Sequence, residues 1–380
     1  MRVVDRLRRS IQGSAAKAFD QAFVFAMEMR GARMRKQAES LSHDERLERL
    51  RAIEADYGAP DRLDYFQTPP SATPTLRSVR KGALGAVVMD ASWSSGCEPF
   101  LAAVRDSYLS LDRNRTAHAR LYLARQPRPA VILIHGYMGG QWAVEERAWP
   151  IAWLQRRGLD VAIAVLPFHA LRGHPDRRAP PFPGADPRVT NEGFRQAVFD
   201  LRSLMQLLRA RGAPQIGVMG MSLGGYTTSL LATLEPTLSF AVPIIPLASI
   251  ADFARARGRL GTPAQATDQH RALEAANAVV SPFSRPSQLP PDRMLVIGGD
   301  ADRITPIAHA ERIARHFDAP LVRIHGGHLL QFGRGEAFRE IGKMLRRLDL
   351  ELVHADMWSS QPTSQRAQSR RRIQLHLAQR

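Results

Sequence analysis

Short apolar runs alternate with helical stretches through residues 130–348 of this 380-residue chain. The apolar runs are unbroken, which is typical of strands that a parallel sheet buries on both faces. The sequence therefore predicts an α/β fold with a mostly parallel central sheet flanked by helices. The predicted strands are residues 130–134, 161–166, 216–219, 240–245, 294–297 and 321–324, and the predicted helices are residues 141–157, 192–211, a stretch from 223, 307–317 and 336–348.

The first 75 residues are predicted to be a helical, amphipathic extension that ends in a linker. Phe19, Phe23 and Met27 recur at helical spacing and share one face. The linker, residues 59–74, is rich in proline and polar residues, which break helices. The extension has three open interpretations: it packs on the main domain, it forms a dimer contact, or it lies on an anionic membrane.

Residues 76–350 are predicted to be the main domain, with weaker strand patterns at 85–92 and 119–124. Residues 351–380 are basic and polar, and we expect them to form a flexible tail. Two insertions follow strands of the main domain and are the expected lid and pocket wall: residues 168–190 and 248–291.

The composition limits the partners and the location of the protein. The 53 basic residues exceed the 36 acidic ones by 17, and only four of the basic residues are lysines. This charge suits a polyanionic partner, either nucleic acid or an anionic membrane surface that the protein binds peripherally, and its alternative explanation is a general bias toward arginine in the source proteome. The 7% aromatic content argues against a nucleic-acid groove. The single cysteine, Cys97, excludes an intrachain disulfide and favours a cytoplasmic protein. The apolar run at 22–27 is too short to span a bilayer.

A candidate nucleophile lies between a predicted strand and a predicted helix. The sequence Gly220-Met221-Ser222-Leu223-Gly224 directly follows the strand at 216–219. A sharp turn at this place needs small residues two positions before and after the serine, so that the hydroxyl projects above the sheet. The alternative is an ordinary serine in a glycine-rich turn.

This pentapeptide and its context resemble the α/β-hydrolase superfamily over roughly residues 115–350. The resemblance implies a catalytic serine, acid and histidine in that order along the chain, and Ser222, Asp302 and His328 occur in that order. The serine needs an imidazole as base, and the imidazole needs a carboxylate to orient it.

Asp302 has two rivals as the acid. Its spacing to Gly299 and Pro306 is similar to the family's Gly-x-x-Asp pattern followed by proline, which favours it over Asp300. Asp252 is the second rival, because some family members carry the acid after the preceding strand.

His328 has one rival as the base. It follows Gly326-Gly327, and the family's pattern of small residues before the catalytic histidine selects it over His325. We expect His325 to be a structural ring at the end of the last strand.

Two backbone amides are expected to stabilise the oxyanion. Leu223 supplies the first, and the second comes from the His135-Gly136-Tyr137-Met138 stretch, which is similar to the family's His-Gly-x motif. The resemblance selects Tyr137, with Met138 as the alternative and as a candidate substrate contact. We interpret His135 as a brace for this loop.

His169 and Arg172 follow the predicted strand at 161–166, so we expect them at the crevice rim. Their Pro-Phe-His-x-x-Arg stretch, taken with the serine motif, is similar to a little-characterised branch of the superfamily. Arg172 either binds an anionic group of the substrate or forms a salt bridge that holds the insertion.

The resemblance implies a serine hydrolase that cleaves a carboxylic ester, including a lipid-like one, with no cofactor. The sequence contains no His-Glu-x-x-His, Cys-x-x-Cys or Gly-x-x-x-x-Gly-Lys motif, so it implies no metal and no nucleotide. Three alternatives stay open: an amide, thioester or peptide hydrolase with the same triad, a non-catalytic interaction module of this fold, and a protein that its arginine-rich ends tether to a membrane or to nucleic acid, with hydrolysis secondary. The sequence gives no oligomeric state.

Overall fold

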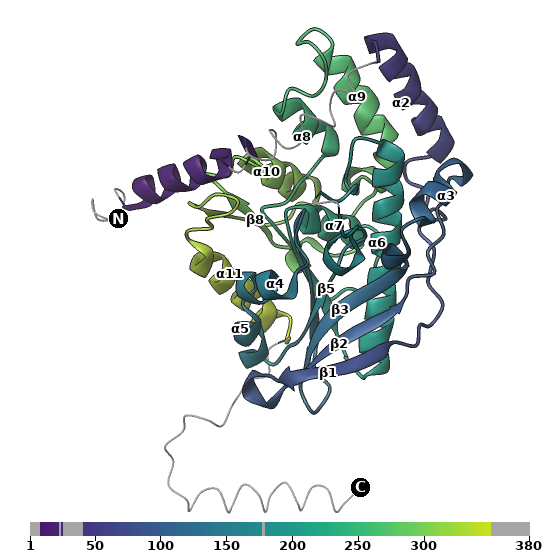
Figure 1. The fold of residues 1–380 in the computed structure, drawn as a ribbon. Coiled ribbons are helices and arrows are strands. Elements are labelled where there is room, and N and C mark those ends of the chain that lie inside the picture. The colour runs from purple at the N-terminus through teal and green to yellow at the C-terminus, as the bar shows by residue number, and fades with distance from the viewer. Residues whose placement is uncertain (1–7, 23, 26–40, 177–178, 351–380) are drawn as a thin grey trace, which may run out of the picture.

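A nine-stranded sheet forms the centre of the computed structural model, which describes residues 8–22, 24–25, 41–176 and 179–350 (Figure 1). The strands are β1 (Thr75–Lys81), β2 (Val87–Ser94), β3 (Thr116–Leu123), β4 (Ala130–Ile134), β5 (Asp160–Ala164), β6 (Ile216–Met221), β7 (Ala241–Ile244), β8 (Val296–Gly299) and β9 (Leu321–Ile324).

Helices flank this sheet on both sides. They are α2 (His43–Tyr57), α3 (Ala102–Leu109), α4 (Trp142–Ala148), α5 (Ile151–Arg156), α6 (Pro187–Ala210), α7 (Leu223–Ala232), α8 (Ile250–Ala256), α9 (Ala266–Ala276), α10 (Ile307–His316) and α11 (Arg334–Arg347). A further helix, here called the N-terminal helix, covers residues 8–22 and 24–25.

The strand order is β1-β2-β3-β5-β4-β6-β7-β8-β9. The pairs β1-β2, β2-β3 and β3-β5 are antiparallel. The six strands from β4 to β9 are parallel to one another. The predicted fold class, a mostly parallel sheet between helices, is therefore confirmed.

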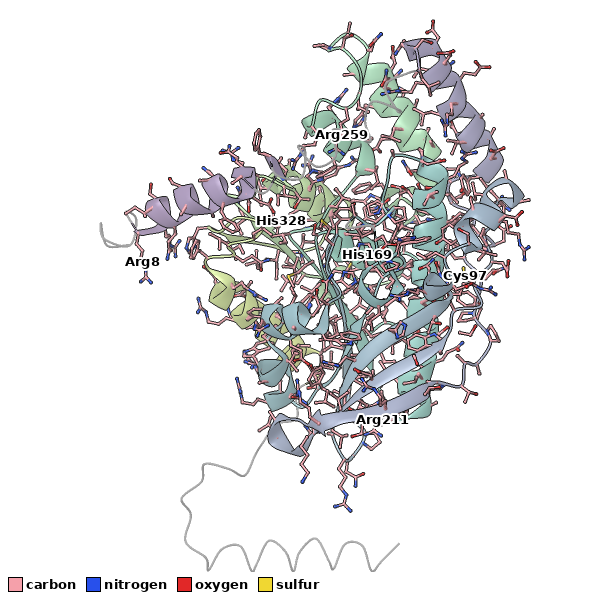
Figure 2. The ribbon with its side chains drawn as sticks, viewed as in Figure 1. Arg8, Cys97, His169, Arg211, Arg259 and His328 are labelled. Carbon is pink, nitrogen blue, oxygen red and sulfur yellow. The ribbon has the colours of Figure 1, made fainter. Side chains whose placement is uncertain are left out.

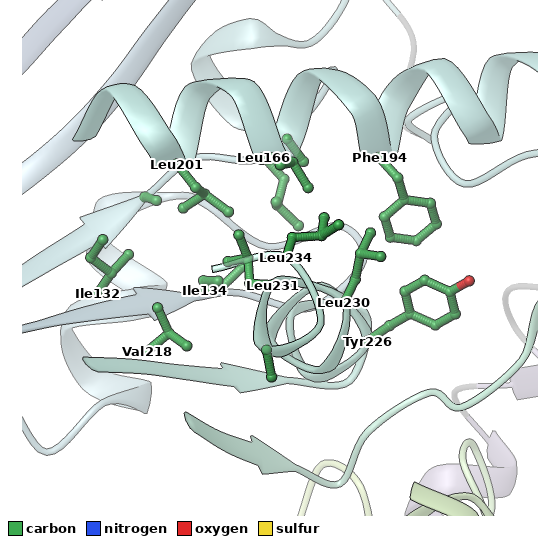
Figure 3. Close-up of a cluster of buried hydrophobic side chains, with 14 of the residues drawn as sticks. Ile132, Ile134, Leu166, Phe194, Leu201, Val218, Tyr226, Leu230, Leu231 and Leu234 are labelled. Carbon is green, nitrogen blue, oxygen red and sulfur yellow. The ribbon is translucent and has the colours of Figure 1, made fainter. Parts of the chain in front are cut away.

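The central strands are buried on both faces, which explains their unbroken apolar sequence. All five residues of β4 are buried, and successive side chains point to opposite faces. Ile132 and Ile134 pack in one cluster with α6 and α7, as Figure 3 shows. Val131 and Leu133 pack in a second cluster with α5 and α11.

The strand order places a crevice between β4 and β6. From β4 the chain crosses to β5 on one side and then returns to β6 on the other. In open α/β sheets, ligands bind beyond the carboxyl ends of the two strands at such a reversal. Ile134 pairs in register with Gly220 there, so the loop after β4 lies beside the turn after β6.

The predicted single helix at 141–157 is two helices in the structure. The α4 helix ends before Trp149, and α5 begins after Pro150. Because proline lacks an N–H and restricts the residue before it, a continuous helix is disfavoured at this place.

The N-terminal extension packs on the main domain. Leu50, Ile53 and Tyr57 of α2 belong to the same hydrophobic cluster as β4, and α2 lies against α9. In the N-terminal helix, Phe19, the one described residue of the expected apolar stripe, is 52% exposed. Phe23 and Met27 of that stripe, like the predicted tail at 351–380, lie outside the described residues. Among the described helices, none has the length and hydropathy that crossing a bilayer requires.

Candidate active site

Ser222 occupies a strained turn between β6 and α7. Its backbone has φ 56° and ψ −112°, a left-handed conformation that a non-glycine residue adopts only when its surroundings hold it there. The Ser222 N–H donates to Ile244 O at 3.0 Å, and Ser222 O accepts from the N–H groups of Tyr226 and Leu247, both at 3.0 Å. These bonds fix the turn at the carboxyl end of β6.

The glycines that flank the serine have no room for a side chain. A Cβ at Gly220 would lie 2.1 Å from Gly224 O, and one at Gly224 would lie 2.1 Å from Ile134 O. Glycine at both positions therefore lets α7 start close against the ends of β4 and β6. This contact is the physical reason for the Gly-x-Ser-x-Gly spacing.

Asp302 and His328 form a buried pair at the same edge of the sheet. His328 Nδ1 lies 2.7 Å from Asp302 Oδ2, and the Asp302 side chain is fully buried. A proton on Nδ1 satisfies this contact, so that Nε2 is left with a lone pair. Asp302 Oδ1 accepts the N–H groups of Ile304 and Thr305, each at 2.8 Å.

Thr305 contacts both residues of this pair, and the sequence analysis missed it. Its hydroxyl lies 3.0 Å from His328 Nδ1, 3.1 Å from Asp302 Oδ2 and 3.0 Å from Ile245 O. The hydroxyl thus bridges the acid and the imidazole, and it ties both to the end of β7. Because an Asp side chain often accepts the N–H two or three residues on, the Asp-x-x-Thr spacing was a signal for this turn.

The histidine loop, residues 325–331, reaches the serine turn through Gln331. The Gln331 amide nitrogen donates to His328 O at 3.1 Å and lies 3.6 Å from the sulfur of Met221, the residue before the serine. In the described chain no hydrogen bond joins the Ser222 hydroxyl to His328. Such bonds are often long before a substrate is present.

The strand order and the serine turn together identify the fold. If β1 is set aside and the strands from β2 to β9 are counted from one to eight along the chain, their order in the sheet is 1-2-4-3-5-6-7-8. Of these eight strands only β3 is antiparallel to the others. Ser222 follows the fifth of these strands at a strand-to-helix turn with positive φ. The chain has the α/β-hydrolase fold.

The loop after β4 lies against the serine, where an α/β-hydrolase fold holds its oxyanion. A Cβ at Gly136 would lie 3.3 Å from Ser222 Cβ and 3.8 Å from its hydroxyl oxygen. In the described chain the N–H groups of Leu223, Tyr137 and Met138 donate to no acceptor. Leu223 and one of the other two are therefore available to a ligand, and the choice between Tyr137 and Met138 stays open.

His135 fixes this loop from the buried side through its ring nitrogens. Its ring is fully buried, with Nδ1 2.7 Å from Gly136 O and with Nε2 accepting the Leu166 N–H at 3.0 Å. Burial lowers the pKa of His135, although the charge of Glu145 opposes this effect. The ring is neutral at pH 7 and spans the ends of β4 and β5.

His169 and Arg172 do not reach the crevice rim, contrary to expectation. Both side chains are fully buried. Arg172 forms an ion pair with Asp200 at 2.8 Å and donates to Val165 O and Asn114 O. The chain turns inward because Phe168 and Ala170 have φ values of 62° and 44°. Arg172 thus holds the insertion in place and is not accessible to a substrate anion.

His169 lies in the interior of the molecule (Figure 2), beside His135 and Tyr137 of the loop after β4. Its Nδ1 is 2.8 Å from Pro167 O, and its ring packs edge-on against Tyr137 with centroids 5.7 Å apart. Burial and then the neighbouring His135 lower the pKa of His169 well below its usual value. The ring supports Tyr137 from the protein interior.

The three rival residues have other partners. Asp300 lies 2.8 Å from Arg323 at the surface, and His325 Nε2 lies 2.9 Å from the Gln12 side chain. Asp252 pairs with His270 at 2.7 Å and with Arg312 at 2.5 Å. None of them contacts Ser222 or the Asp302–His328 pair directly.

Asp252, His270 and Glu274 form a group of potential metal ligands within the described chain. Arg312 donates to both carboxylates of this group, to Asp252 at 2.5 Å and to Glu274 at 3.2 Å. The guanidinium already supplies the positive charge that a metal ion would bring. We therefore interpret the group as an ion-pair network that joins α8, α9 and α10.

Comparisons by sequence find few relatives. No protein-family profile matches the chain. An uncharacterised protein of Mycobacterium tuberculosis, found in strains CDC 1551/Oshkosh and ATCC 25618/H37Rv, is 30% identical over 227 residues. The match covers 58% of this chain and 54% of the relative, so the chain spans about half the length of the curated relatives it matches.

Comparisons by structure find esterases at low identity. Acetyl xylan esterase 1 from Thermoanaerobacterium sp. JW/SL YS485 is 18% identical, with a TM-score of 0.49 over 80% of this chain and 93% of that chain. Est1E from Butyrivibrio proteoclasticus is 15% identical, with a TM-score of 0.42 over 74% of this chain and 100% of that chain. At these values the similarity carries no information about a substrate.

Proposed function

We propose that this protein is a serine hydrolase that cleaves carboxylic esters through an acyl-enzyme on Ser222. The observation that carries the proposal is the Asp302–His328 contact of 2.7 Å at the same sheet edge as the strained serine. An imidazole with its Nδ1–H on a buried carboxylate is a base that accepts a proton at Nε2. A serine hydroxyl at neutral pH needs such a base to become a nucleophile.

In the first half of the reaction, Ser222 Oγ attacks the ester carbonyl while His328 Nε2 takes the hydroxyl proton. The oxyanion that forms accepts hydrogen bonds from the N–H of Leu223 and from that of Tyr137 or Met138. His328 then gives its proton to the departing alkoxide, and an alcohol leaves. Asp302 and Thr305 keep the ring oriented throughout and stabilise its positive charge.

In the second half, water replaces the alcohol. His328 Nε2 takes a proton from the water as its oxygen attacks the acyl carbonyl, and the same two N–H groups bind the second oxyanion. When this intermediate collapses, His328 returns the proton to Ser222 Oγ. The products are a carboxylic acid and the free enzyme, so the cycle needs no cofactor.

We propose an ester and not an amide because an alkoxide leaves more readily than an amine anion. Its departure therefore depends less on proton donation by His328. An acyl chain of moderate length is supported by exposed apolar side chains near the site. Leu329, next to His328, is 39% exposed, and Phe25 of the N-terminal helix, which is 65% exposed, lines a surface hollow together with Arg303, the residue after Asp302. Both suit an amphiphilic, lipid-like ester.

Hydrolysis of p-nitrophenyl esters with acyl chains of two to twelve carbons tests this proposal. We expect turnover by the wild type with an initial burst of one equivalent of nitrophenol, and a loss of at least about 10³-fold in Ser222→Ala. Faster turnover of the longer chains would support the lipid-like substrate. Equal turnover by the wild type and Ser222→Ala would contradict the proposal.

Two alternatives are outcomes of the same experiment. An amide or thioester hydrolase would show a weak burst with oxygen esters and faster acylation by a thioester or an activated amide. A folded wild type that hydrolyses none of these substrates would support a non-catalytic interaction module.

We propose further that the protein is cytoplasmic and binds peripherally to an anionic membrane surface. The net charge of +17 and the exposed Phe19 and Phe25 support this proposal. Sedimentation with vesicles that contain 30 mol% phosphatidylserine tests it, with phosphatidylcholine vesicles as the control. Binding should fall steeply between low and high salt and on deletion of the residues after 357. Binding that survives both changes would contradict an electrostatic contact.

A further inference from the structure

The N-terminal helix brings one buried carboxylate to the two loops that carry Asp302 and His328. Asp20 is fully buried although it belongs to a helix near the start of the chain. Its Oδ2 accepts the His328 N–H at 2.7 Å and the Arg303 N–H at 3.1 Å, while its Oδ1 accepts the Leu329 N–H at 3.1 Å. Among the described residues the carboxylate therefore has three partners, all of them backbone amides.

These three amides belong to the two segments that must stay in register for proton transfer. Arg303 directly follows Asp302, and the other two amides are those of His328 and of the next residue. The acid loop, residues 300–305, and the histidine loop also meet directly, because the Ala301 N–H donates to Gly326 O at 3.1 Å. Asp20 thus links the backbones of the two loops whose side chains, Asp302 and His328, are in contact at 2.7 Å.

The histidine loop is shaped to receive this helix. A Cβ at Gly327 would lie 2.7 Å from Asp20 Oδ2 and 3.1 Å from the Ala16 side chain. A residue with a side chain before His328 would therefore displace the carboxylate. The glycine before the histidine makes room for the helix as well as for the turn of the loop.

The docked face of the helix is small and polar. Besides Ala16 and Asp20, it presents Gln12, whose Oε1 lies 2.9 Å from His325 Nε2 at the start of the histidine loop. Phe19 and Ile11 point away from the protein and are 52% and 62% exposed. The helix therefore gains little from burying large apolar side chains, and its polar contacts concentrate on the loops of the site.

We propose that Asp20 is a positioning residue of the active site, through which the N-terminal helix holds the acid loop and the histidine loop in register. The inference rests on the proposed hydrolase function, because it assigns Asp20 the task of holding Asp302 and His328 for proton transfer. Loss of the carboxylate leaves three backbone N–H groups without an acceptor. The loops then relax, and a displacement near 1 Å at a catalytic group costs about 10²-fold in rate.

Substitutions on this helix in the full-length protein separate positioning from simple docking. Asp20→Ala removes the carboxylate that accepts all three N–H groups. Asp20→Asn keeps an oxygen for two of the amides but turns an NH₂ group toward the third. Phe19→Ala is the matched control on the exposed face, and Gln12→Ala removes a docking contact without touching the amides of residues 303, 328 and 329.

Three readouts are measured on each variant: kcat and KM for an ester, the rate of labelling of Ser222 by a fluorophosphonate, and amide hydrogen exchange of the two loops. We expect kcat and the labelling rate to fall about 10²-fold in Asp20→Ala and about tenfold in Asp20→Asn, with KM changed less than about threefold. Exchange of both loops should accelerate in the same order. Phe19→Ala should match the wild type, and Gln12→Ala should lose less than Asp20→Asn.

A folded Asp20→Ala with the wild-type kcat and unchanged loop exchange would overturn the inference. If Asp20→Ala does not fold, Asp20→Asn decides in its place, and a wild-type kcat in that variant would overturn the inference. If the wild type reacts with neither ester nor probe, the proposed function fails separately. In that case unchanged exchange in Asp20→Asn would overturn the structural part, and accelerated exchange of both loops would support it.

Discussion

Two aspartate–histidine pairs in the described chain have the same 2.7 Å contact but different surroundings. In the Asp302–His328 pair the contact is made by Nδ1, and the two side chains are 0% and 9% exposed. In the Asp252–His270 pair it is made by Nε2, and the side chains are 31% and 18% exposed. The distance alone therefore does not distinguish a catalytic pair from a structural one.

The other partners of each carboxylate make the distinction. Asp302 accepts from two backbone amides and faces the Thr305 hydroxyl, all of them neutral groups that leave its charge available to His328. Asp252 is bound by the permanent cation of Arg312 at 2.5 Å. Its charge is already compensated, so a protonated His270 gains less from it. We infer that the first pair serves catalysis and the second holds α8 and α9 on α10.

The largest expected difference is in kcat, between a variant of the Asp302–His328 pair and a variant of the Asp252–His270 pair. Asp302→Asn should reduce kcat by about 10⁴-fold, because an amide favours the wrong imidazole tautomer. Asp252→Asn should change kcat by less than about threefold, since Asp252 contacts neither Ser222 nor His328. Steady-state hydrolysis of an ester by the two variants checks this. Equal losses in both variants would break the comparison.

A smaller contrast concerns the hydroxyl beside each pair. Thr305→Val should reduce kcat about tenfold, because it removes the bridge between the acid and the imidazole while it preserves the shape. Thr305→Ser should retain most of the rate. Ser249 caps α8 through the Asp252 N–H at 3.0 Å, so Ser249→Ala should instead lower the free energy of unfolding by about 1 kcal/mol. Kinetics and urea denaturation of all three variants test the contrast, and a slow Ser249→Ala of normal stability would contradict it.

The guanidinium of Arg312 is the cation beside the Asp252–His270 pair. Arg312→Met keeps an unbranched aliphatic side chain but removes the guanidinium, which lies 4.2 Å from the centroid of the Phe283 ring and pairs with Asp252 and Glu274. Because the network is partly exposed, we expect the free energy of unfolding to fall by only about 1 kcal/mol, with kcat nearly unchanged. Urea denaturation at pH 7 measures it. A gain in stability would show that the network serves something other than the fold.

The smallest expected effect is a pH dependence of stability from Asp252. Burial raises the pKa of Asp252, but hydrogen bonds from His270 and Arg312 outweigh this and lower it below its usual value. Since the folded pKa lies below the unfolded one, the stabilisation is complete above about pH 4 and is lost as the pH falls further. The wild type should therefore lose more unfolding free energy than Asp252→Asn between about pH 5 and pH 2. Equal losses would contradict this assignment.

The sequence predicted the elements that depend on burial alone. The strand at 130–134 has the predicted bounds, and all five of its apolar residues are buried. The strand at 321–324 also has the predicted bounds, although Arg323 is exposed and only Ile324 is fully buried. The strand β1 was not predicted, since all seven of its residues are exposed at the sheet edge and show no apolar alternation. The order Ser222, Asp302 and His328 came from the family resemblance; the structure brings Asp302 and His328 into contact, and their catalytic roles stay a prediction.

The sequence could not predict contacts that depend on distant parts of the fold. Asp20 and His328 are 308 positions apart, and no local pattern links them. Arg172 was predicted at the rim because it follows a strand, but two residues with positive φ turn it into the core. Such reversals are set by tertiary packing, as are the partners that separate the two aspartate–histidine pairs.

Covalent labelling by a fluorophosphonate, mapped by intact mass and peptide analysis, tests the central claim most directly. We expect one phosphonyl adduct on Ser222 of the wild type and of His270→Ala, and none on Ser222→Ala or His328→Ala within the same time. A folded wild type without an adduct, or an adduct that persists in His328→Ala at the wild-type rate, would contradict an activated serine at this site.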